Sequence, residues 1–146
     1  RSCDPSGQPK ADLRDLPSLL RRYKSEYEFI FEQLYNFATA DEPSLHEAYT
    51  TPNLLRKFLE AYLGFRKAVP RAWYKKLDLL FDDAESRREV QKFADEGSHL
   101  QTLDRTFTHS DIISSSQRCV QMVLEGLKSK DPEHYNSLVE IAGGET

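Results

Sequence analysis

The sequence contains few of the residues that stabilise small secreted domains or bind metals through thiolates. Its 146 residues include two cysteines, Cys3 and Cys119, with no C-x-x-C spacing and no histidine at the spacing of a zinc ligand. This pattern argues against a disulfide framework and against a structural zinc site. We predict that Cys3 is a thiol in a terminal tail and that Cys119 is a thiol buried in a helix, as in a reducing cytoplasm.

Long apolar segments and an excess of positive charge are also lacking. No apolar run approaches the roughly 20 residues that cross a bilayer, and the N-terminus has no apolar signal core. We therefore expect no membrane partner. The formal net charge is −4, so any nucleic-acid contact must come from a local basic patch. Because the chain begins with Arg1 rather than Met, we expect a fragment or a processed product.

Sequence motifs for nucleotides and for common hydrolases are absent. There is no G-x-x-x-x-G-K-[ST] loop, so this chain is not expected to bind a nucleotide in the P-loop manner. The patterns G-x-G-x-x-G, H-E-x-x-H and G-x-S-x-G do not occur either. The carboxylates are scattered, and no cluster of histidines and acids has the spacing of a metal site. We expect neither a metal nor a cofactor in this chain.

The apolar residues of the sequence are spaced mainly with the periodicity of helices. Apolar residues make up 38% and charged residues 30% of the chain, which is typical of amphipathic helices with wide polar faces. Apolar side chains recur at intervals of three and four, and no segment alternates convincingly as a strand does. We predict a flexible arm at residues 1–14 and a single all-α domain at residues 15–146, a bundle of five to six helices. The predicted helices cover residues 17–39, 51–69, 71–81, 83–95, 110–128 and 132–142.

Two of the predicted helix starts depend on a capping residue followed by proline. Residues 38–50, ATADEPSLHEAYT, are interpreted as a polar break, after which Thr51 would cap a helix with Pro52 in its first turn. Asp131 and Pro132 would begin the last helix in the same way.

Arg56 and Glu60 are the charges in the stretch TPNLLRKFLEAYLGF that draw most interest. Four residues apart on a helix, they project from one face. One interpretation is a helical ion pair that stabilises by about 0.2–0.5 kcal/mol. The other is a functional pair, because dense apolar neighbours would partly bury the charges, and buried charge is usually paired or functional. The spacing alone is compatible with both.

Metal-independent RNA cleavage is a reaction in which a functional Arg56–Glu60 pair could take part. A base must take the proton of the ribose 2′-OH, an acid must protonate the leaving 5′-oxygen, and a fixed cation must stabilise the phosphorane. Glu60 and Arg56 could fill two of these roles, and a histidine the third. His46 and His134 are expected at the surface, whereas His99 follows a helix on a turn that can reach across a bundle. A solvated loop histidine is the alternative for His99.

The order of four short segments adds a family resemblance. SEYEFIFEQLY, PNLLRKFLEAYLGFR, FADEGSH and DPEHYNSL, in this order across residues 16–138, resemble the C-terminal helical region of bacterial ATPases of the RloC/PrrC anticodon-nuclease type. The resemblance implies a helical nuclease module related to the HEPN ribonucleases. The resemblance also implies that an ABC-like ATPase region, upstream in the same gene, controls this module. ATP would bind to that region only and not to this chain. The family's R-x-x-x-E pair and downstream histidine match Arg56, Glu60 and His99, with His109 as the alternative histidine.

The activity that the resemblance implies is cleavage of the tRNA anticodon loop in the bacterial cytoplasm, as a phage defence. The products carry a 2′,3′-cyclic phosphate and a 5′-OH. Glu60 would be the general base, His99 the general acid and Arg56 the stabilising cation, in a homodimer. The ATPase region itself is missing from this sequence. A non-catalytic reading therefore stays open, in which a helical regulatory or dimerisation domain of an ABC-like defence or repair ATPase uses the apolar stripe of residues 17–39 to pack against a partner.

A basic segment with interleaved aromatic residues is the predicted RNA-binding surface. Residues 65–76, FRKAVPRAWYKK, combine phosphate-binding cations with rings on which bases can stack. The alternative is a solvated basic face around a tryptophan of the core. Arg87 and Arg88 form a weaker second patch, interpreted as a solvated face. The predicted substrate-binding residues are Arg66, Lys67, Arg71, Trp73, Lys75 and Lys76, and Tyr74 lies among them.

Overall fold

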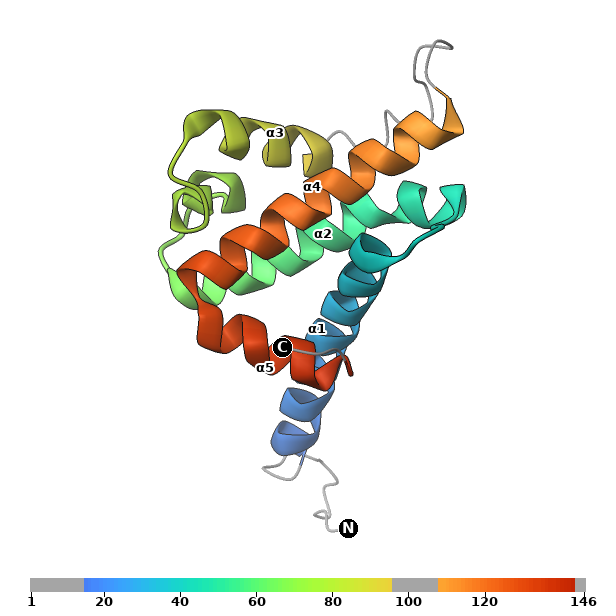
Figure 1. Ribbon diagram of the computed structural model, residues 1–146. Coiled ribbons are helices and arrows are strands. Elements are labelled where there is room, and N and C mark those ends of the chain that lie inside the picture. The colour runs from blue at the N-terminus through green and yellow to red at the C-terminus, as the bar shows by residue number, and fades with distance from the viewer. Residues whose placement is uncertain (1–14, 96–107, 144–146) are drawn as a thin grey trace.

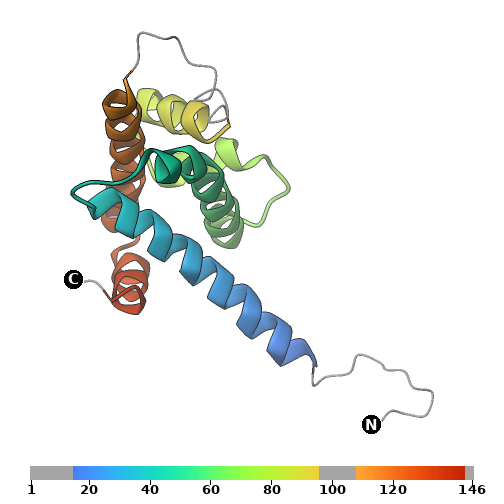
Figure 2. The same ribbon diagram turned by 90° about the vertical axis from the view of Figure 1, so that its right-hand side faces the viewer.

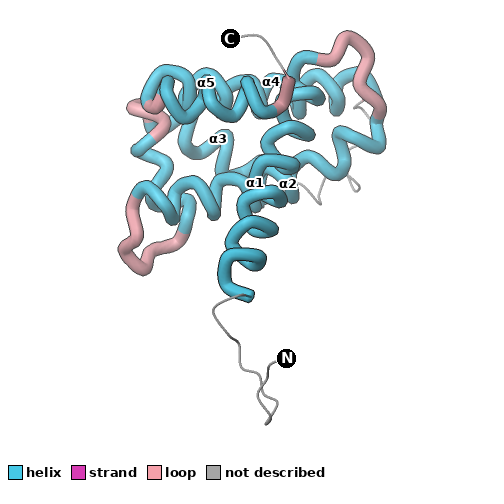
Figure 3. Tube along the Cα trace, turned by 90° about the horizontal axis from the view of Figure 1, so that it is seen from below, coloured by secondary structure: helices cyan, strands magenta, loops and turns pink. Residues whose placement is uncertain are grey.

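The structure, a computed structural model, describes residues 15–95 and 108–143. Six helices and no strand occur in these ranges, so the predicted all-α bundle of five to six helices is confirmed (Figures 1 and 3). The proposed arm at residues 1–14 lies outside them. The helices are α1 (Asp15–Thr39), α2 (Leu45–Arg66), the 3-10 helix η1 (Trp73–Leu79), α3 (Ala84–Asp95), α4 (His109–Lys130) and α5 (Pro132–Ile141).

Helix α2 lies at the centre of the bundle. It contacts α1, η1, α3 and α4, while α5 packs against α1 and α4. Together η1 and α3 lie along one side of α2, and the N-terminal turns of α1 extend beyond the other helices (Figures 1 and 2). The core is built around this centre because α2 is apolar on two adjoining sides. The largest fully buried side chains of the core are Phe31, Leu34, Leu55, Phe58, Leu59, Leu63, Leu77, Leu80, Val90, Val120, Val123 and Leu127.

The prediction that residues 38–50 are a break is wrong from Leu45 onward, since α2 begins there. Ser44 and Glu47 form a capping box: the Ser44 hydroxyl accepts from the Glu47 N–H at 3.1 Å, and the Glu47 carboxylate accepts from the Ser44 N–H at 2.8 Å. Thr51 and Pro52 consequently lie inside the helix and are buried. Proline donates no hydrogen bond there, whereas the Thr51 hydroxyl donates to the Glu47 carbonyl at 2.6 Å.

The C-terminal end of α1 is held by side chains of α4. The Gln117 amide donates to the carbonyls of Phe37 and Ala40 at 2.9 and 3.0 Å, and the Gln121 amide donates to the Ala38 carbonyl at 2.8 Å. Carbonyls in the last turn of a helix have no partner within it, so these amides supply the missing donors. They fix the turn that leads into α2.

The remaining predicted boundaries agree with the structure to within a few residues. A capping box of Thr108 and Asp111 begins α4. Helix α5 begins at Pro132 as predicted, but the side chain of its N-cap Asp131 makes no capping bond. Residues 71–81 contain a 3-10 helix rather than an α-helix. Cys119 is buried as predicted, and burial raises the pKa of its thiol to about 12.

Candidate functional site

Arg56 and Glu60 line a surface pocket of about 520 Å³, here called the Arg56 pocket. Helix α2 contributes these two residues, η1 and the residues just before it contribute most of the opposite wall, and α3 contributes Asp95. The site is assembled where the C-terminal end of α3 meets the middle of α2. Its lining residues are Arg56, Glu60, Arg71, Ala72, Trp73, Tyr74, Lys76 and Asp95.

The Arg56 guanidinium lies between two carboxylates. Its Nε is 3.2 Å from Glu60 Oε2, and its Nη1 is 3.6 Å from Asp95 Oδ1. The predicted i,i+4 ion pair is thus present, but the side chains of Arg56 and Glu60 are 46% and 47% exposed. An ion pair in contact with water at this level stabilises a fold by about 0–1 kcal/mol. The fold therefore depends little on these two charges.

Lys76 is the most enclosed charged residue of the pocket. Its residue surface is 6% exposed, and within the described residues it has no hydrogen bond or ion pair. Among the side-chain polar atoms of the described residues, only Ser116 Oγ is both fully enclosed and without a hydrogen-bond partner. The Lys76 ammonium also lacks a partner, so it is not fully enclosed and keeps access to water. The Arg56 pocket is the solvent-filled space that this residue lines. An ammonium that faces this pocket without a counter-ion attracts an anion to it.

The predicted substrate-binding residues fall into separate groups. Arg71, Trp73 and Lys76 line the Arg56 pocket together with the predicted catalytic pair, and Lys75 lines a neighbouring pocket. Trp73 is 8% exposed, so it is also part of the core, as the alternative interpretation held. Lys67, the C-cap of α2, lines neither the Arg56 pocket nor the neighbouring pocket of Lys75.

Arg66 lies on another face of α2. It follows Glu60 by six residues, which is roughly 240° around a helix. There its Nη1 donates to the Tyr62 hydroxyl at 2.7 Å and is 3.4 Å from Asp131 Oδ2. Residues 65–76 are contiguous in the sequence, but the turn of α2 directs Arg66 away from the Arg56 pocket. The predicted basic segment therefore does not form one surface.

The histidine of the predicted triad is not among the described residues. His99 lies outside them, and His109 is the first residue of α4, with a side chain that also lies outside them. The assignment of either histidine to the site therefore stays a prediction. Asp95 is the residue that sequence reasoning missed: it stands in the quoted segment FADEGSH, but nothing in its spacing predicts contact with Arg56.

Comparison with known proteins establishes the relationship of the chain. The family model AAA_13, described as an AAA domain, matches residues 6–125. The chain belongs to this AAA domain family. The match includes α1, α2, η1 and α3 and most of α4, and with them every described residue of the Arg56 pocket. Searches of curated proteins and of solved structures found no match.

This member of the AAA domain family has no P-loop sequence, and its described residues form helices only. None of the described helices is long and apolar enough to cross a bilayer. Among residues 15–95 and 108–143, no three histidine, cysteine, aspartate or glutamate side chains are grouped so that they could hold a metal ion.

A second polar cluster joins α1, α2 and α5. Tyr27 Oη is 2.8 Å from His134 Nε2, and the Tyr62 hydroxyl donates to Asp131 Oδ2 at 2.9 Å. The imidazole ring stacks on both tyrosines, with centroids 5.9 Å from Tyr27 and 5.4 Å from Tyr62. His134, expected at the surface, is therefore half-buried. We call these four residues and Arg66 the His134 cluster.

Burial sets the protonation states in the His134 cluster. Desolvation lowers the pKa of His134 below 6.5; Asp131 opposes this shift and Arg66 adds to it. Desolvation also raises the pKa of Tyr62 to about 12, aided by its hydrogen bond to Asp131. The imidazole and the phenol are thus both neutral at pH 7. Asp131 is fixed by Tyr62 and Arg66, which explains why it does not cap α5.

The lowered pKa of His134 predicts a stability that depends on pH. The folded protein binds fewer protons at this site than the unfolded chain, so the free energy of unfolding falls as pH drops below about 6.5 toward the folded pKa. His134→Gln, whose amide oxygen can still accept from Tyr27, should reduce this slope in urea unfolding between pH 8 and pH 5. His46→Gln, at an exposed position, should leave it unchanged. Equal slopes for His134→Gln and wild type would contradict the assignment.

Proposed function

We propose that this chain is a metal-independent RNA endonuclease module that cuts the tRNA anticodon loop in a bacterial phage-defence system. One observation carries the proposal: the R-x-x-x-E pair of α2 and three predicted substrate-binding residues, Arg71, Trp73 and Lys76, line one pocket. The resemblance to RloC/PrrC-type nucleases and membership of an AAA domain family are compatible with it. An ABC-like ATPase region of the same gene would control the module, which would act as a homodimer.

The proposed reaction begins at the ribose 2′-OH next to the scissile phosphate. Glu60 takes its proton, and the oxygen attacks phosphorus. The bond to the 5′-oxygen breaks, and that oxygen takes a proton from a general acid, assigned to His99 from the sequence. The products are a 2′,3′-cyclic phosphate and a 5′-OH, so atoms and protons balance without a cofactor.

The contacts of Arg56 suit the role of stabilising the phosphorane. Glu60 and Asp95 engage its Nε and Nη1, which holds the planar guanidinium in one orientation. Its Nη2 has no ion pair within the described residues and can donate to a phosphate oxygen. Lys76 adds a second cation that lacks a counter-ion. A preorganised pair of cations stabilises developing negative charge without reorganisation during the reaction.

Incubating the purified 146-residue chain with total tRNA and sequencing the new ends tests the proposal. Cleavage in anticodon loops is expected. His99→Ala should abolish it and His109→Ala should not; the reverse pattern would move the acid to His109. Absence of cleavage by the wild type would reject the proposal, and equal cleavage by both variants and the wild type would reject a histidine acid.

A non-catalytic regulatory or dimerisation domain is the second candidate, and the position of α1 favours it. The N-terminal turns of α1 extend beyond the bundle (Figure 2). Apolar residues recur at intervals of three and four in this part of the sequence, which predicts an apolar stripe suited to packing against a partner. Sedimentation of a stable dimer that Leu19→Glu dissociates, combined with no cleavage of tRNA, would favour this function over the nuclease.

A further inference from the structure

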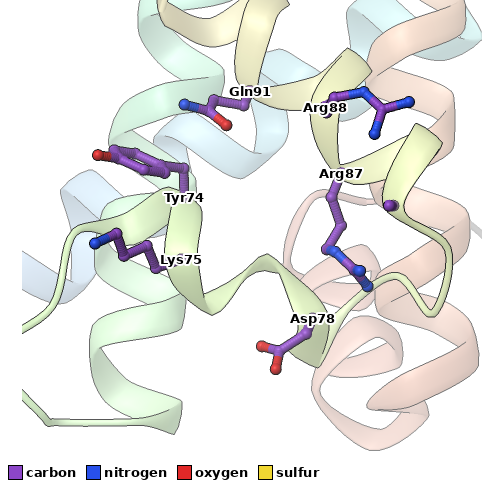
Figure 4. A pocket seen from close by; sticks show the side chains of 7 residues that line it. Tyr74, Lys75, Asp78, Arg87, Arg88 and Gln91 are labelled. Atoms are coloured by element: carbon purple, nitrogen blue, oxygen red, sulfur yellow. The ribbon is translucent and has the colours of Figure 1, made fainter.

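A second pocket, of about 380 Å³, lies between η1 and α3 beside the Arg56 pocket. We call it the Arg87 pocket. Three of its lining side chains are cations and one is a carboxylate, Asp78. Figure 4 shows Tyr74, Lys75 and Gln91 on one side of it, and Arg87 and Arg88 on the other. Positive charge therefore borders the pocket on both sides.

Arg87 is fixed in position rather than mobile on the surface. Its Nη1 donates to the carbonyls of Phe81 and Asp82 at 2.7 and 3.0 Å. These bonds leave Nε and Nη2 available, and Figure 4 shows the side chain descending from α3 into the space above Asp78. Lys75 and Arg88 have no ion pair or hydrogen bond within the described residues, so their charges are not neutralised by the protein.

The neighbouring surface of α3 has the opposite charge balance. A third pocket is lined by three carboxylates, Glu85, Glu89 and Asp95, and by the cations Arg88 and Lys92. Excess positive charge is thus confined to the η1 side of α3. An anion that approaches α3 is attracted to the Arg87 pocket and repelled from the third pocket.

Tyr74 connects the Arg87 pocket to the proposed active site. It lines both pockets, and 37% of its surface is exposed, so its ring is available between them. A single strand crossing the ring could stack one base on it while the flanking phosphates enter the two pockets. Alternating aromatic rings and cations along a groove are the common recognition device for single-stranded nucleic acids.

We infer that the Arg87 pocket binds a second phosphate of the single-stranded RNA whose scissile phosphate lies in the Arg56 pocket. The inference rests on the proposed function of the Arg56 pocket, which it extends to an RNA segment of more than one nucleotide. Arg87 binds the phosphate through Nε and Nη2, Lys75 and Arg88, whose charged ends point outward on opposite sides of the pocket in Figure 4, attract it electrostatically, and Tyr74 stacks on the adjoining base.

Binding of RNA, measured apart from cleavage, tests the inference. The full chain carrying Glu60→Gln is titrated into a labelled single strand of about ten nucleotides, within the usual range of site sizes, and anisotropy gives Kd. Adding Lys75→Glu and Arg88→Glu should weaken binding at least tenfold and make its salt dependence shallower by about one ion, because the pocket no longer neutralises one phosphate. Tyr74→Ala should also weaken it about tenfold.

The control is Lys92→Glu, which removes a cation of α3 from the third pocket and should change Kd less than threefold. Circular dichroism checks that each variant is folded. Unchanged binding by the Lys75→Glu/Arg88→Glu variant, an equal loss for Lys92→Glu, or no binding of RNA by the parent would overturn the inference. RNA that binds through the Arg87 pocket but is never cut by the wild type would reject the nuclease function alone. Unaffected RNA binding by the double variant, together with normal cleavage by Lys75→Glu/Arg88→Glu in a chain that keeps Glu60, would reject the Arg87 pocket alone.

Discussion

Replacing Phe58 by alanine should lower the free energy of unfolding by about 3–5 kcal/mol. The side chain is 0% exposed, and its ring lies at the junction of α1 and α2. Its centroid is 5.1 Å from that of Tyr27, 5.9 Å from that of Phe31 and 6.1 Å from that of Tyr62. Truncation removes these contacts and leaves a cavity that rigid neighbours cannot fill. Denaturant unfolding followed by circular dichroism measures the loss.

Phe29→Ala is the matched control for Phe58→Ala. Phe29 lies on α1 and is 57% exposed, so the same truncation should change the free energy of unfolding by about 0.5 kcal/mol or less. The difference between the two variants isolates the packing of Phe58 from the chemistry of the substitution. Similar losses for both would mean that α1 and α2 do not meet around Phe58.

Glu60→Gln should lower the rate of tRNA cleavage by a factor of about 10²–10⁴, the usual contribution of a general base. The amide keeps the shape of the side chain but cannot take the 2′-OH proton. Because Glu60 and Arg56 form a half-exposed pair, stability should change by about 1 kcal/mol or less. Single-turnover cleavage and denaturant unfolding of the same preparation separate the two effects.

Arg56→Lys and Lys57→Gln complete this comparison. Lysine keeps the charge of Arg56 but loses the planar fork, so cleavage should fall by about 10²–10³-fold. Lys57 is the next residue of α2 and is exposed, yet it does not line the Arg56 pocket, so Lys57→Gln should cleave at nearly the wild-type rate. Full activity in Arg56→Lys, or parallel losses of activity and stability in Glu60→Gln, would support a structural ion pair instead.

The helices could be predicted from the sequence because each carries a continuous apolar stripe. The main error, at the start of α2, came from giving Pro52 more weight than the Ser44–Glu47 capping box. A proline in the first turn is common, whereas one buried two turns into a helix is tolerated only when its neighbours pack around it. No local feature of the sequence predicts that η1 is a 3-10 helix rather than an α-helix. Its conformation depends on how Trp73 and Leu77 are buried.

The candidate site could be predicted only where it is local. The spacing of Arg56 and Glu60 predicts their contact, since both lie on one helix. The contact between Arg56 and Asp95 depends on the packing of α3 against α2, and the burial of His134 depends on the packing of α5 against α1. Long-range packing of this kind cannot be predicted from the spacing of residues in the sequence. It brings Arg71 and Lys76 to the Arg56 pocket and directs Arg66 to the His134 cluster.

A tRNA anticodon stem-loop with one 2′-deoxy nucleotide at the cut site provides the most direct test of the proposed cleavage. Attack by the 2′-OH requires that hydroxyl, so cleavage at that position should disappear while the all-ribose loop yields a 2′,3′-cyclic phosphate and a 5′-OH. Mass spectrometry of the fragments reads both outcomes. Cutting of the deoxy-substituted loop at the same position and rate, or fragments ending in a 5′-phosphate, would contradict the proposed mechanism.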